Sequence, residues 1–354
     1  MSKKTVPNIV IYWLLLGCLL IFSMVIIGGI TRLTGSGLSI TEWDLIKGTF
    51  PPTSEGAWQT LFEKYQTSPE YKYKNSDFNV EDFKTIFWWE YIHRLFGRMI
   101  GFVFIIPFIY FLVKKYIYKE LLWKLGVIFL LGGFQGFLGW FMVKSGLVDN
   151  PAVSHYRLAA HLLNAFLSFG FTFWVALDLI KDKNPNIFNF KISSTKLQQL
   201  KNLGIVFFIL LIVQIIYGAF VAGLKAGMIF NTFPLMGNQL VADSVGMAWS
   251  KGGISSLLEN EASVQFVHRY MAYIVAGLAL YISYLLIKKN ELKVLSNVGY
   301  LLGGIVIVQF LLGVFTLLYA VPVSLGVIHQ AGAFILLGVT LYFLNVIYNK
   351  ELVN

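Results

Sequence analysis

Long apolar runs, separated by shorter polar segments, follow one another along the whole chain. The first run covers residues 5–31 and contains no Asp, Glu, Lys or Arg. About 20 apolar residues in a helix cross the hydrocarbon core of a bilayer, so this run is long enough to span a membrane. Seven more runs of spanning length lie at residues 87–113, 125–143, 158–177, 203–224, 263–287, 294–318 and 324–347. The pattern predicts an all-α integral membrane protein with eight transmembrane helices.

The composition supports the membrane interpretation and excludes other classes of protein. Of the 354 residues, 57% are hydrophobic and only 13% are charged, whereas a soluble protein carries about 25% charged residues. This excludes a soluble globular enzyme, a disordered chain and a nucleic-acid-binding domain, although the net charge is +10. The single cysteine, Cys18, excludes a disulfide framework and a thiolate zinc site. The expected surroundings of the chain are therefore a lipid bilayer and no nucleic acid.

The distribution of basic residues predicts which ends of the helices face the cytoplasm. Fifteen lysines, mostly in short connections, fall on the side that holds the N-terminus, and ten Lys and Arg residues fall in the longer connections of the other side. Basic residues in short connections mark the cytoplasmic face. We therefore expect both termini in the cytoplasm, and the long connections at residues 32–86 and 225–262 outside.

The second half of the chain repeats landmarks of the first half in the same order. The sequence EYIHR at residues 90–94 corresponds to QFVHR at 265–269, and QGFLG at 135–139 corresponds to QFLLG at 309–313. GGITRLTGSG at 28–37 and GAFVAGLKAG at 218–227 end the first and the fifth run. Because each unit has four spans, both units have the same topology. We predict two pseudo-symmetric four-helix bundles, at residues 1–190 and 191–354.

Four of the five histidines occupy matching depths in the even-numbered spans. His93 and His161 belong to the first half, and His268 and His329 to the second half. Two imidazoles turned into a helical bundle commonly hold a haem iron from both faces. An interhelical hydrogen bond or a proton relay is the alternative for such histidines, but their pairwise repetition favours two haem sites. The fifth histidine, His155, is expected in the loop before the fourth span and receives no role.

Arginines near the predicted outer face are candidate partners for haem propionates, because a guanidinium can bind a carboxylate through two hydrogen bonds. Contact with lipid headgroups is the alternative, although two of these residues lie rather deep in an apolar run for that role. The five candidates are Arg32, Arg94, Arg98, Arg157 and Arg269.

Glu90 distinguishes the first half from the second. It lies three residues before His93, on the same helix face, and its counterpart Gln265 is neutral. A carboxylate inside a membrane is costly to bury unpaired, which makes it a candidate for function. An ion pair with Arg94, four residues later, is the structural alternative. The difference predicts a catalytic first half that uses Glu90 and a second half that holds a permanent haem.

The motifs in combination resemble the haem A synthase family, whose members make haem A for cytochrome oxidase. They are GGITRLTGSGLSITEWD from residue 28, EYIHRLFGR from 90, HYRLAAHLLNA from 155, QFVHR from 265 and GVIHQAGA from 326. The resemblance implies oxidation of the C8 methyl group of haem O to a formyl group, by successive hydroxylations and loss of water. It also implies haem O as substrate at His93 and His161, haem B between His268 and His329, and Glu90 as the catalytic residue.

The cysteine content places the resemblance within one part of that family. Some bacterial members carry cysteines in the outer loops, whereas Cys18 lies within the first span, so the chain is more similar to the branch without loop cysteines. A bacterial plasma membrane is the expected location. An external electron donor is the implied partner, and haem O synthase and cytochrome oxidase assembly factors are candidate partners.

Three other functions share parts of the pattern. A dihaem cytochrome b-type quinol oxidoreductase needs the same four histidines, but it does not need a carboxylate in one half only. A transporter with parallel repeats would use the histidines as a proton relay, and a haem carrier would bind haem without forming a product. The resemblance favours the synthase over all three.

Overall fold

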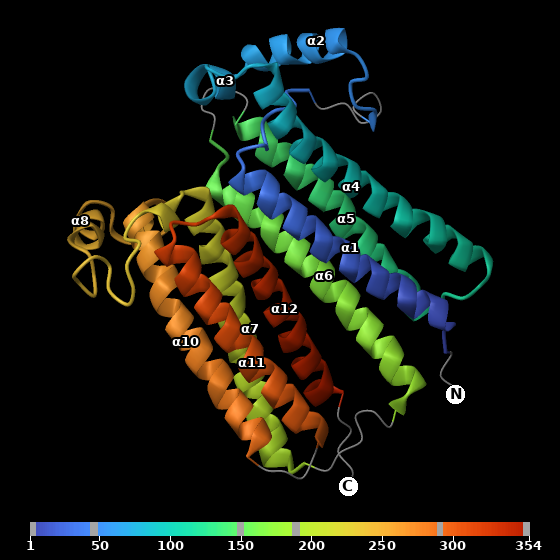
Figure 1. Ribbon diagram of the computed structural model, residues 1–354. Coiled ribbons are helices and arrows are strands. Elements are labelled where there is room, and N and C mark those ends of the chain that lie inside the picture. Colours follow the sequence, from blue (N-terminus) through green and yellow to red (C-terminus); the bar gives the residue numbers. More distant parts are fainter. Residues whose placement is uncertain (1–4, 43–48, 147–151, 186–191, 289–292, 350–354) are drawn as a thin grey trace.

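The computed structural model confirms an all-helical chain with eight helices that are long and apolar enough to cross a membrane (Figure 1). It describes residues 5–42, 49–146, 152–185, 192–288 and 293–349. The eight helices are α1 (Asn8–Leu33), α4 (Val80–Val113), α5 (Lys119–Gly146), α6 (His155–Lys183), α7 (Ser194–Gly223), α10 (Glu261–Ile287), α11 (Lys293–Leu318) and α12 (Val323–Tyr348). Each of the eight predicted runs overlaps one of these helices.

The long helices form two sets of four, in agreement with the predicted repeat (Figure 1). In the second set, α7 packs on α10 and α12, and α11 packs on the same two helices, which closes a ring. In the first set, α1 packs on α4 and α6, and α5 packs on α6, whereas the backbones of α4 and α5 come close at few positions and the two helices meet through side chains such as Phe104 and Phe129. The predicted domain boundary at residues 190 and 191 lies outside the described residues and stays a prediction.

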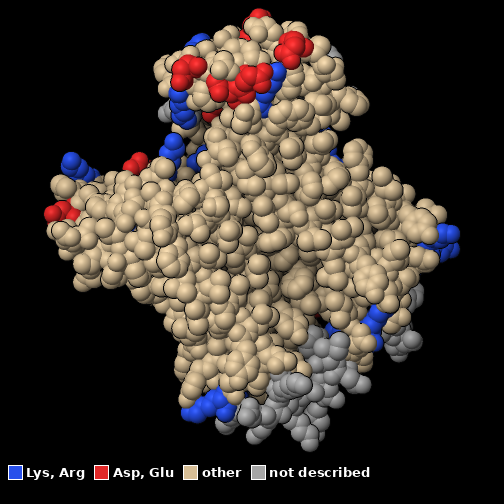
Figure 2. All heavy atoms as spheres, viewed as in Figure 1, with Lys and Arg blue, Asp and Glu red and all other residues tan. Residues whose placement is uncertain are grey.

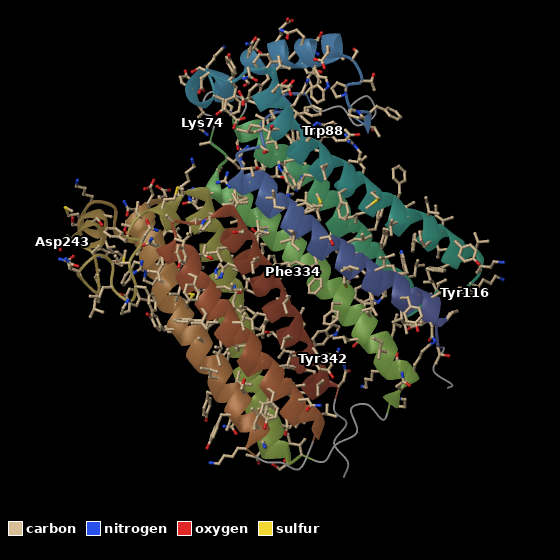
Figure 3. All side chains as sticks on the ribbon, viewed as in Figure 1. Lys74, Trp88, Tyr116, Asp243, Phe334 and Tyr342 are labelled. Carbon is tan, nitrogen blue, oxygen red and sulfur yellow. The ribbon has the colours of Figure 1, made fainter. Side chains whose placement is uncertain are left out.

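The two sets are joined by contacts of α1 and α6 with α12 and of α6 with α7. The largest hydrophobic cluster lies at this junction and includes Phe166, Phe169 and Phe334. The ring centroid of Phe334 is 4.9 Å from that of Phe166 and 4.2 Å from that of Phe169, and Figure 3 shows Phe334 at the centre of the molecule. Aromatic burial of this kind contributes strongly to packing, so the two halves form one continuous core.

The outward faces of the helices suit a lipid environment. Large apolar side chains on α4 and α5 are exposed, among them Phe102, Ile106 and Leu130. The face shown in Figure 2 has a broad belt almost without charged residues, between an acidic and basic cap at one end and lysines toward the other. Such a belt is what the hydrocarbon region requires, and the protein is a multi-pass membrane protein.

Polar groups set the start of α4, which hydrophobicity alone does not mark. The helix begins at Val80, before the predicted run at residue 87, because Asn79 caps it. The Asn79 side chain accepts hydrogen bonds from the backbone N–H groups of Glu81 and Asp82, and the Asp82 side chain accepts one from the Asn79 N–H. This reciprocal arrangement stabilises a helix start in water.

The start of α6 corrects one prediction from the sequence. His155 was expected in the loop before the fourth span, but it is the first residue of α6. The backbone N–H of Leu158 donates to the Ser154 carbonyl (2.9 Å), which extends the helix to this point. A Cβ on Gly223 of α7 would lie 2.7 Å from the His155 Cα, so α6 and α7 approach closely here because residue 223 has no side chain.

Shorter helices fold the two long connections. They are α2 (Glu55–Gln66), α3 (Pro69–Lys74), η3 (Ala226–Met228), α8 (Asp243–Gly252), η4 (Gly253–Ser255) and α9 (Ser256–Glu259). Helices α2 and α3 form a cap over the first turns of α4 (Figure 1). Aromatic residues hold the cap on α4: the ring of Trp58 packs edge-on to Phe87 with centroids 5.0 Å apart, and Tyr65 stacks on Phe83 at 5.1 Å.

A buried carboxyl group should make the stability of this cap depend on pH. Glu70 is 5% exposed and accepts a hydrogen bond from the Tyr65 hydroxyl (3.2 Å). Burial raises the pKa of Glu70 from 4.5 to about 7; Glu90 adds to the rise, and Lys74 and Tyr65 oppose it. Folding therefore favours the protonated carboxyl, so its contribution to stability is full below pH 4.5 and is lost as the pH rises through 7.

Comparison of the wild type with Glu70→Gln tests this pH dependence. The backbone N–H groups of α2 and α3 are expected to exchange hydrogen faster in the wild type than in the variant at pH 8, with the difference shrinking toward pH 5. Glu63→Gln, at an exposed position of α2, is the control and should match the wild type at both pH values. A difference for Glu70→Gln that does not change with pH would contradict the prediction.

Candidate functional site

Each of the four intramembrane histidines faces a glycine of a neighbouring helix. The space that a side chain would occupy at the glycine is taken by the imidazole, which lets two helices approach around the ring. In the first half, a Cβ on Gly28 would lie 3.2 Å from Nε2 of His93, and one on Gly139 would lie 3.3 Å from Cε1 of His161. In the second half, a Cβ on Gly218 would lie 3.2 Å from Cε1 of His268, and one on Gly313 would lie 2.9 Å from Cε1 of His329. The internal repeat therefore extends to the neighbours of the histidines.

The histidines come together in the two predicted pairs. His93 of α4 lies close enough to His161 of α6 for an electrostatic interaction, and His268 of α10 has the same relation to His329 of α12. Each half therefore offers two imidazoles from two different helices. The fifth histidine, His155, belongs to neither pair and packs against Phe220 with ring centroids 5.3 Å apart.

Three glutamines contact these imidazoles, and the sequence analysis assigned them no role. The side-chain Nε2 of Gln214 lies 3.2 Å from Nδ1 of His268, and Nε2 of Gln309 lies 3.2 Å from Nδ1 of His329. Nε2 of Gln135 lies 3.3 Å from Nε2 of His161. Each glutamine comes four residues before a glycine that faces a histidine, a spacing that puts both on one helix face. That Gln-x-x-x-Gly spacing is the sequence signal that could have revealed them.

The paired imidazoles fit axial ligation of a haem iron. A neutral imidazole nitrogen is the usual protein ligand of such an iron. Nδ1 of His161 is buried and has no hydrogen-bond partner among the described residues, so this nitrogen could serve as a ligand. Within the same residues, no three His, Cys, Asp or Glu side chains gather to hold a bare metal ion. The donor set in each half thus suits a metal whose other ligands come from a macrocycle.

Glu90 is buried in the first half and has three hydrogen-bond donors. Its side chain is 3% exposed. Oε2 accepts hydrogen bonds from Oγ of Ser39 (2.7 Å) and from the backbone N–H of Ile40 (2.9 Å), and Oε1 accepts one from Nη2 of Arg94 (2.6 Å). Arg94 also donates to the carbonyls of Ile40 and Glu42. The ion pair that the sequence left as an alternative is present, and it fastens the segment after α1 onto α4.

The second half fastens its first outer segment in the same way without a negative charge. Gln265, the counterpart of Glu90, donates to the backbone carbonyls at positions 226 and 229. Arg269, the counterpart of Arg94, donates to the carbonyls at positions 230 (2.9 Å) and 235 (2.7 Å) and to Oε1 of Gln265 (3.3 Å). The fastening is thus common to both halves, whereas the carboxylate is particular to the first.

The remaining candidate arginines lie in the parts of the helices toward the cap formed by α2 and α3. Arg32 donates to the carbonyls of Ala222 and Gly223 (3.0 and 3.3 Å), which ties α1 to the end of α7. Arg157 donates to the carbonyl of Phe141 (2.8 Å), and the half-buried Arg98 lies one turn below Arg94 on α4. These contacts position the guanidinium groups of Arg32 and Arg157.

Comparisons with known proteins agree with this arrangement. A family model described as cytochrome oxidase assembly protein matches residues 11–341, which include the four paired histidines and Glu90. A protein of Flavobacterium psychrophilum named Heme A synthase is 50% identical over 340 residues, which are 95% of this chain and 97% of that protein. A protein of the same name from Flavobacterium johnsoniae is 48% identical over 340 residues, which are 95% of this chain and 97% of that protein. One from Nitrosospira multiformis is 44% identical over 346 residues, which are 96% of this chain and 94% of that protein.

Proposed function

Because the chain belongs to the cytochrome oxidase assembly protein family, we propose that it is a haem A synthase, an oxidoreductase that converts the C8 methyl group of haem O to a formyl group. The observation that carries the proposal is the pairing of the four histidines together with the buried carboxylate of Glu90, whose counterpart in the second half is the neutral Gln265. Two haem sites explain the pairing, and a reaction at one of them explains the carboxylate.

In this proposal the first half binds the substrate, haem O, between His93 and His161. The backbones of α4 and α5 approach each other less closely than those of the other neighbouring helices, whereas the second set is a closed ring. Exposed apolar residues such as Phe102 and Phe134 follow the two helices. An apolar tail on the substrate can lie along these faces or in the surrounding lipid, because both are apolar.

The second half would hold haem B between His268 and His329. The closed ring of α7, α10, α11 and α12 supports a permanently bound group. Haem B would supply one-electron transfer between the first half and an external electron carrier, which would take up the electrons that the methyl carbon loses. The protein residues around it contribute orientation, through Gly218 and Gly313 and through the two glutamines that touch the imidazoles.

Glu90 would be the catalytic residue of the first half. Its carboxylate would stabilise positive charge at the oxidised methyl carbon and accept a proton from the water that attacks there. Among the described residues, Arg94 is the one donor to Oε1, and a carboxylate oxygen can accept a second hydrogen bond. The bonds from Ser39 and Ile40 to Oε2 keep the group oriented.

The propionates of either haem would lie near the outer face, where Arg32, Arg94, Arg98, Arg157 and Arg269 are the proposed partners. Both termini would be cytoplasmic, and the cap formed by α2 and α3 would lie outside a bacterial plasma membrane. Support comes from the lysine-rich segments at the end of the molecule opposite the cap (Figure 2). Haem O synthase and cytochrome oxidase assembly factors are the proposed partners for delivery of substrate and use of product.

Extraction and chromatography of the haems in the purified protein test the proposal. The wild type is expected to contain haem B together with haem O, haem A or a hydroxylated intermediate. His93→Ala is expected to contain haem B alone. Two equivalents of haem B in the wild type, with no other haem, would contradict the proposal and favour a dihaem cytochrome b-type quinol oxidoreductase.

A glycine substitution tests whether His329 holds haem B. Gly313→Ala is expected to weaken haem B binding on the order of tenfold, the usual effect of disturbing the surroundings of a metal ligand, because the new Cβ would lie 2.9 Å from Cε1 of His329. Gly304→Ala on the same helix is the control, since nothing lies within 4 Å of its Cβ position. Absorbance titration with haem measures both, and equal affinities would contradict the assignment.

A further inference from the structure

The residues that touch the four histidines differ between the halves in one respect. On α5, α7 and α11, a glutamine precedes the histidine-facing glycine by four residues: Gln135 before Gly139, Gln214 before Gly218, and Gln309 before Gly313. On α1 the glycine is Gly28, and the residue four positions earlier is Met24. Three of the four imidazoles therefore have an amide beside them, and His93 has a thioether on the corresponding turn of α1.

In the second half, each amide holds its histidine at two points. Nε2 of Gln214 lies 3.2 Å from Nδ1 of His268 and donates to the His268 carbonyl (3.0 Å). Nε2 of Gln309 lies 3.2 Å from Nδ1 of His329 and donates to the His329 carbonyl (2.9 Å). Each amide thus lies against Nδ1 of its imidazole and is bonded to the backbone of the same histidine, which leaves Nε2 as the nitrogen that faces away from the amide.

Each imidazole also has an acceptor for the proton that metal binding would leave on Nδ1. An imidazole that binds a metal through Nε2 carries its proton on Nδ1 and needs an acceptor there. The backbone carbonyl of Gln214 accepts a hydrogen bond from His268, and that of Gln309 accepts one from His329. The side-chain amides keep their bonds to the histidine carbonyls, and Gly332 leaves the space for the Gln309 amide, since a Cβ on Gly332 would overlap Oε1.

The first half has no such two-point arrangement. Nε2 of Gln135 lies 3.3 Å from Nε2 of His161 rather than from Nδ1, and its Oε1 already accepts a hydrogen bond from Asn164 (2.7 Å). The methyl group of Met24 lies beside Gly97 of α4, since a Cβ on Gly97 would be 3.4 Å from it. A thioether has no hydrogen to donate, so Met24 cannot form the bonds that a glutamine amide forms. His93 is therefore held by packing against α1 and not by an amide on that helix.

We propose that Gln214 and Gln309 are positioning residues that retain the haem of the second half, and that Met24 in place of a glutamine lets the first half release its haem. A ligand already fixed in its binding orientation loses less freedom when the haem binds, so the complex dissociates more slowly. A substrate site must release its product after each reaction, whereas a permanent cofactor site must not. The inference rests on the proposed function, because it assigns the exchanging haem to the first half.

Exchange of the residues between the halves tests the inference. Gln214→Met and Gln309→Met are expected to speed the loss of haem B about tenfold or more, as is usual when a partner of a metal ligand is removed. Met24→Gln is expected to slow the loss of haem O and haem A from the first half several-fold. Gln198→Met is the control, because Gln198 is exposed on α7 and its side chain donates a hydrogen bond to Asn202 on the same helix.

The measurement uses the full-length protein purified in detergent and loaded with its haems. Excess apomyoglobin captures released haem, absorbance follows the rate, and chromatography of the remaining haem tells haem B from haem O and haem A. A folding defect cannot produce the slower loss expected for Met24→Gln. If Gln214→Met and Gln309→Met lose haem B at the same rate as Gln198→Met, the inference is overturned while the proposed function is unaffected. Absence of haem O and haem A from the wild type would contradict the proposed function.

Discussion

Glu90→Gln is expected to lower haem A formation on the order of 100-fold or more, while haem B and haem O remain bound. The magnitude is that of losing a positioned acid–base group. The amide keeps the shape of the carboxylate, and its oxygen can still accept the hydrogen bond from Arg94, while its NH2 group replaces the oxygen that accepts from Ser39. It cannot take up a proton at neutral pH. Chromatography of haems extracted from membranes that contain equal amounts of each variant gives the result.

The second half shows that an amide is tolerated at this place in the fold. Gln265 occupies the equivalent position, and its Oε1 accepts a hydrogen bond from Arg269 at 3.3 Å. Glu81→Gln, which changes an exposed carboxylate on the same helix, is the control and should leave haem A formation unchanged. Haem A formation by Glu90→Gln at the wild-type rate would contradict the catalytic role.

A second variant separates chemistry from fastening of the outer segment. Ser39→Ala removes the hydroxyl that donates to Oε2 of Glu90 but leaves the carboxylate and its ion pair with Arg94. If Glu90 acts mainly by holding residues 39–42, this variant should lose nearly as much activity as Glu90→Gln. In the account given above, Ser39→Ala loses much less.

The other large effect is expected at the histidines and differs between the halves. His268→Ala and His329→Ala should lose haem B. Removing a partner of a metal ligand lowers affinity by up to about 100-fold, and removing the ligand itself should lower the affinity for haem B by more than that. His161→Ala should lose haem O and haem A but keep haem B, as is expected for His93→Ala. The ratio of each haem to protein after purification measures the effect.

His155→Ala provides the matched control for these four variants. His155 packs against Tyr156 and Phe220 at the start of α6 and belongs to neither pair. Its replacement should leave the content of both kinds of haem unchanged. Loss of haem B from His161→Ala, with His268 and His329 intact, would contradict the assignment of one haem site to each half.

The eight long helices could be predicted because membrane helices need long apolar runs, which are visible in any sequence. Their ends could not, since polar contacts set them. Asn79 and Asp82 start α4 in the aqueous cap, and Ser154 and Gly223 allow α6 to begin at His155. Helices α2 and α3 also escaped prediction, because they are short and depend on aromatic contacts with α4.

The site was predictable to the extent that the internal repeat marked it. The repeat singled out the paired histidines and the contrast between Glu90 and Gln265, and the spacing of four residues indicated the ion pair with Arg94. The contacts of Glu90 with Ser39 and Ile40 were not predictable, because they join positions about fifty residues apart through the fold of a polar segment. The glutamines beside the histidines were overlooked because a glutamine in an apolar helix has many uses.

The most direct test of the central claim is production of haem A in a bacterium that makes haem O and no haem A. The chain is expressed in its membrane, and the extracted haems are separated by chromatography. The account predicts that haem A appears with the wild-type chain and does not appear with Glu90→Gln. If the wild-type chain is inserted in the membrane, contains haem B and leaves haem O unconverted, the proposed function is contradicted.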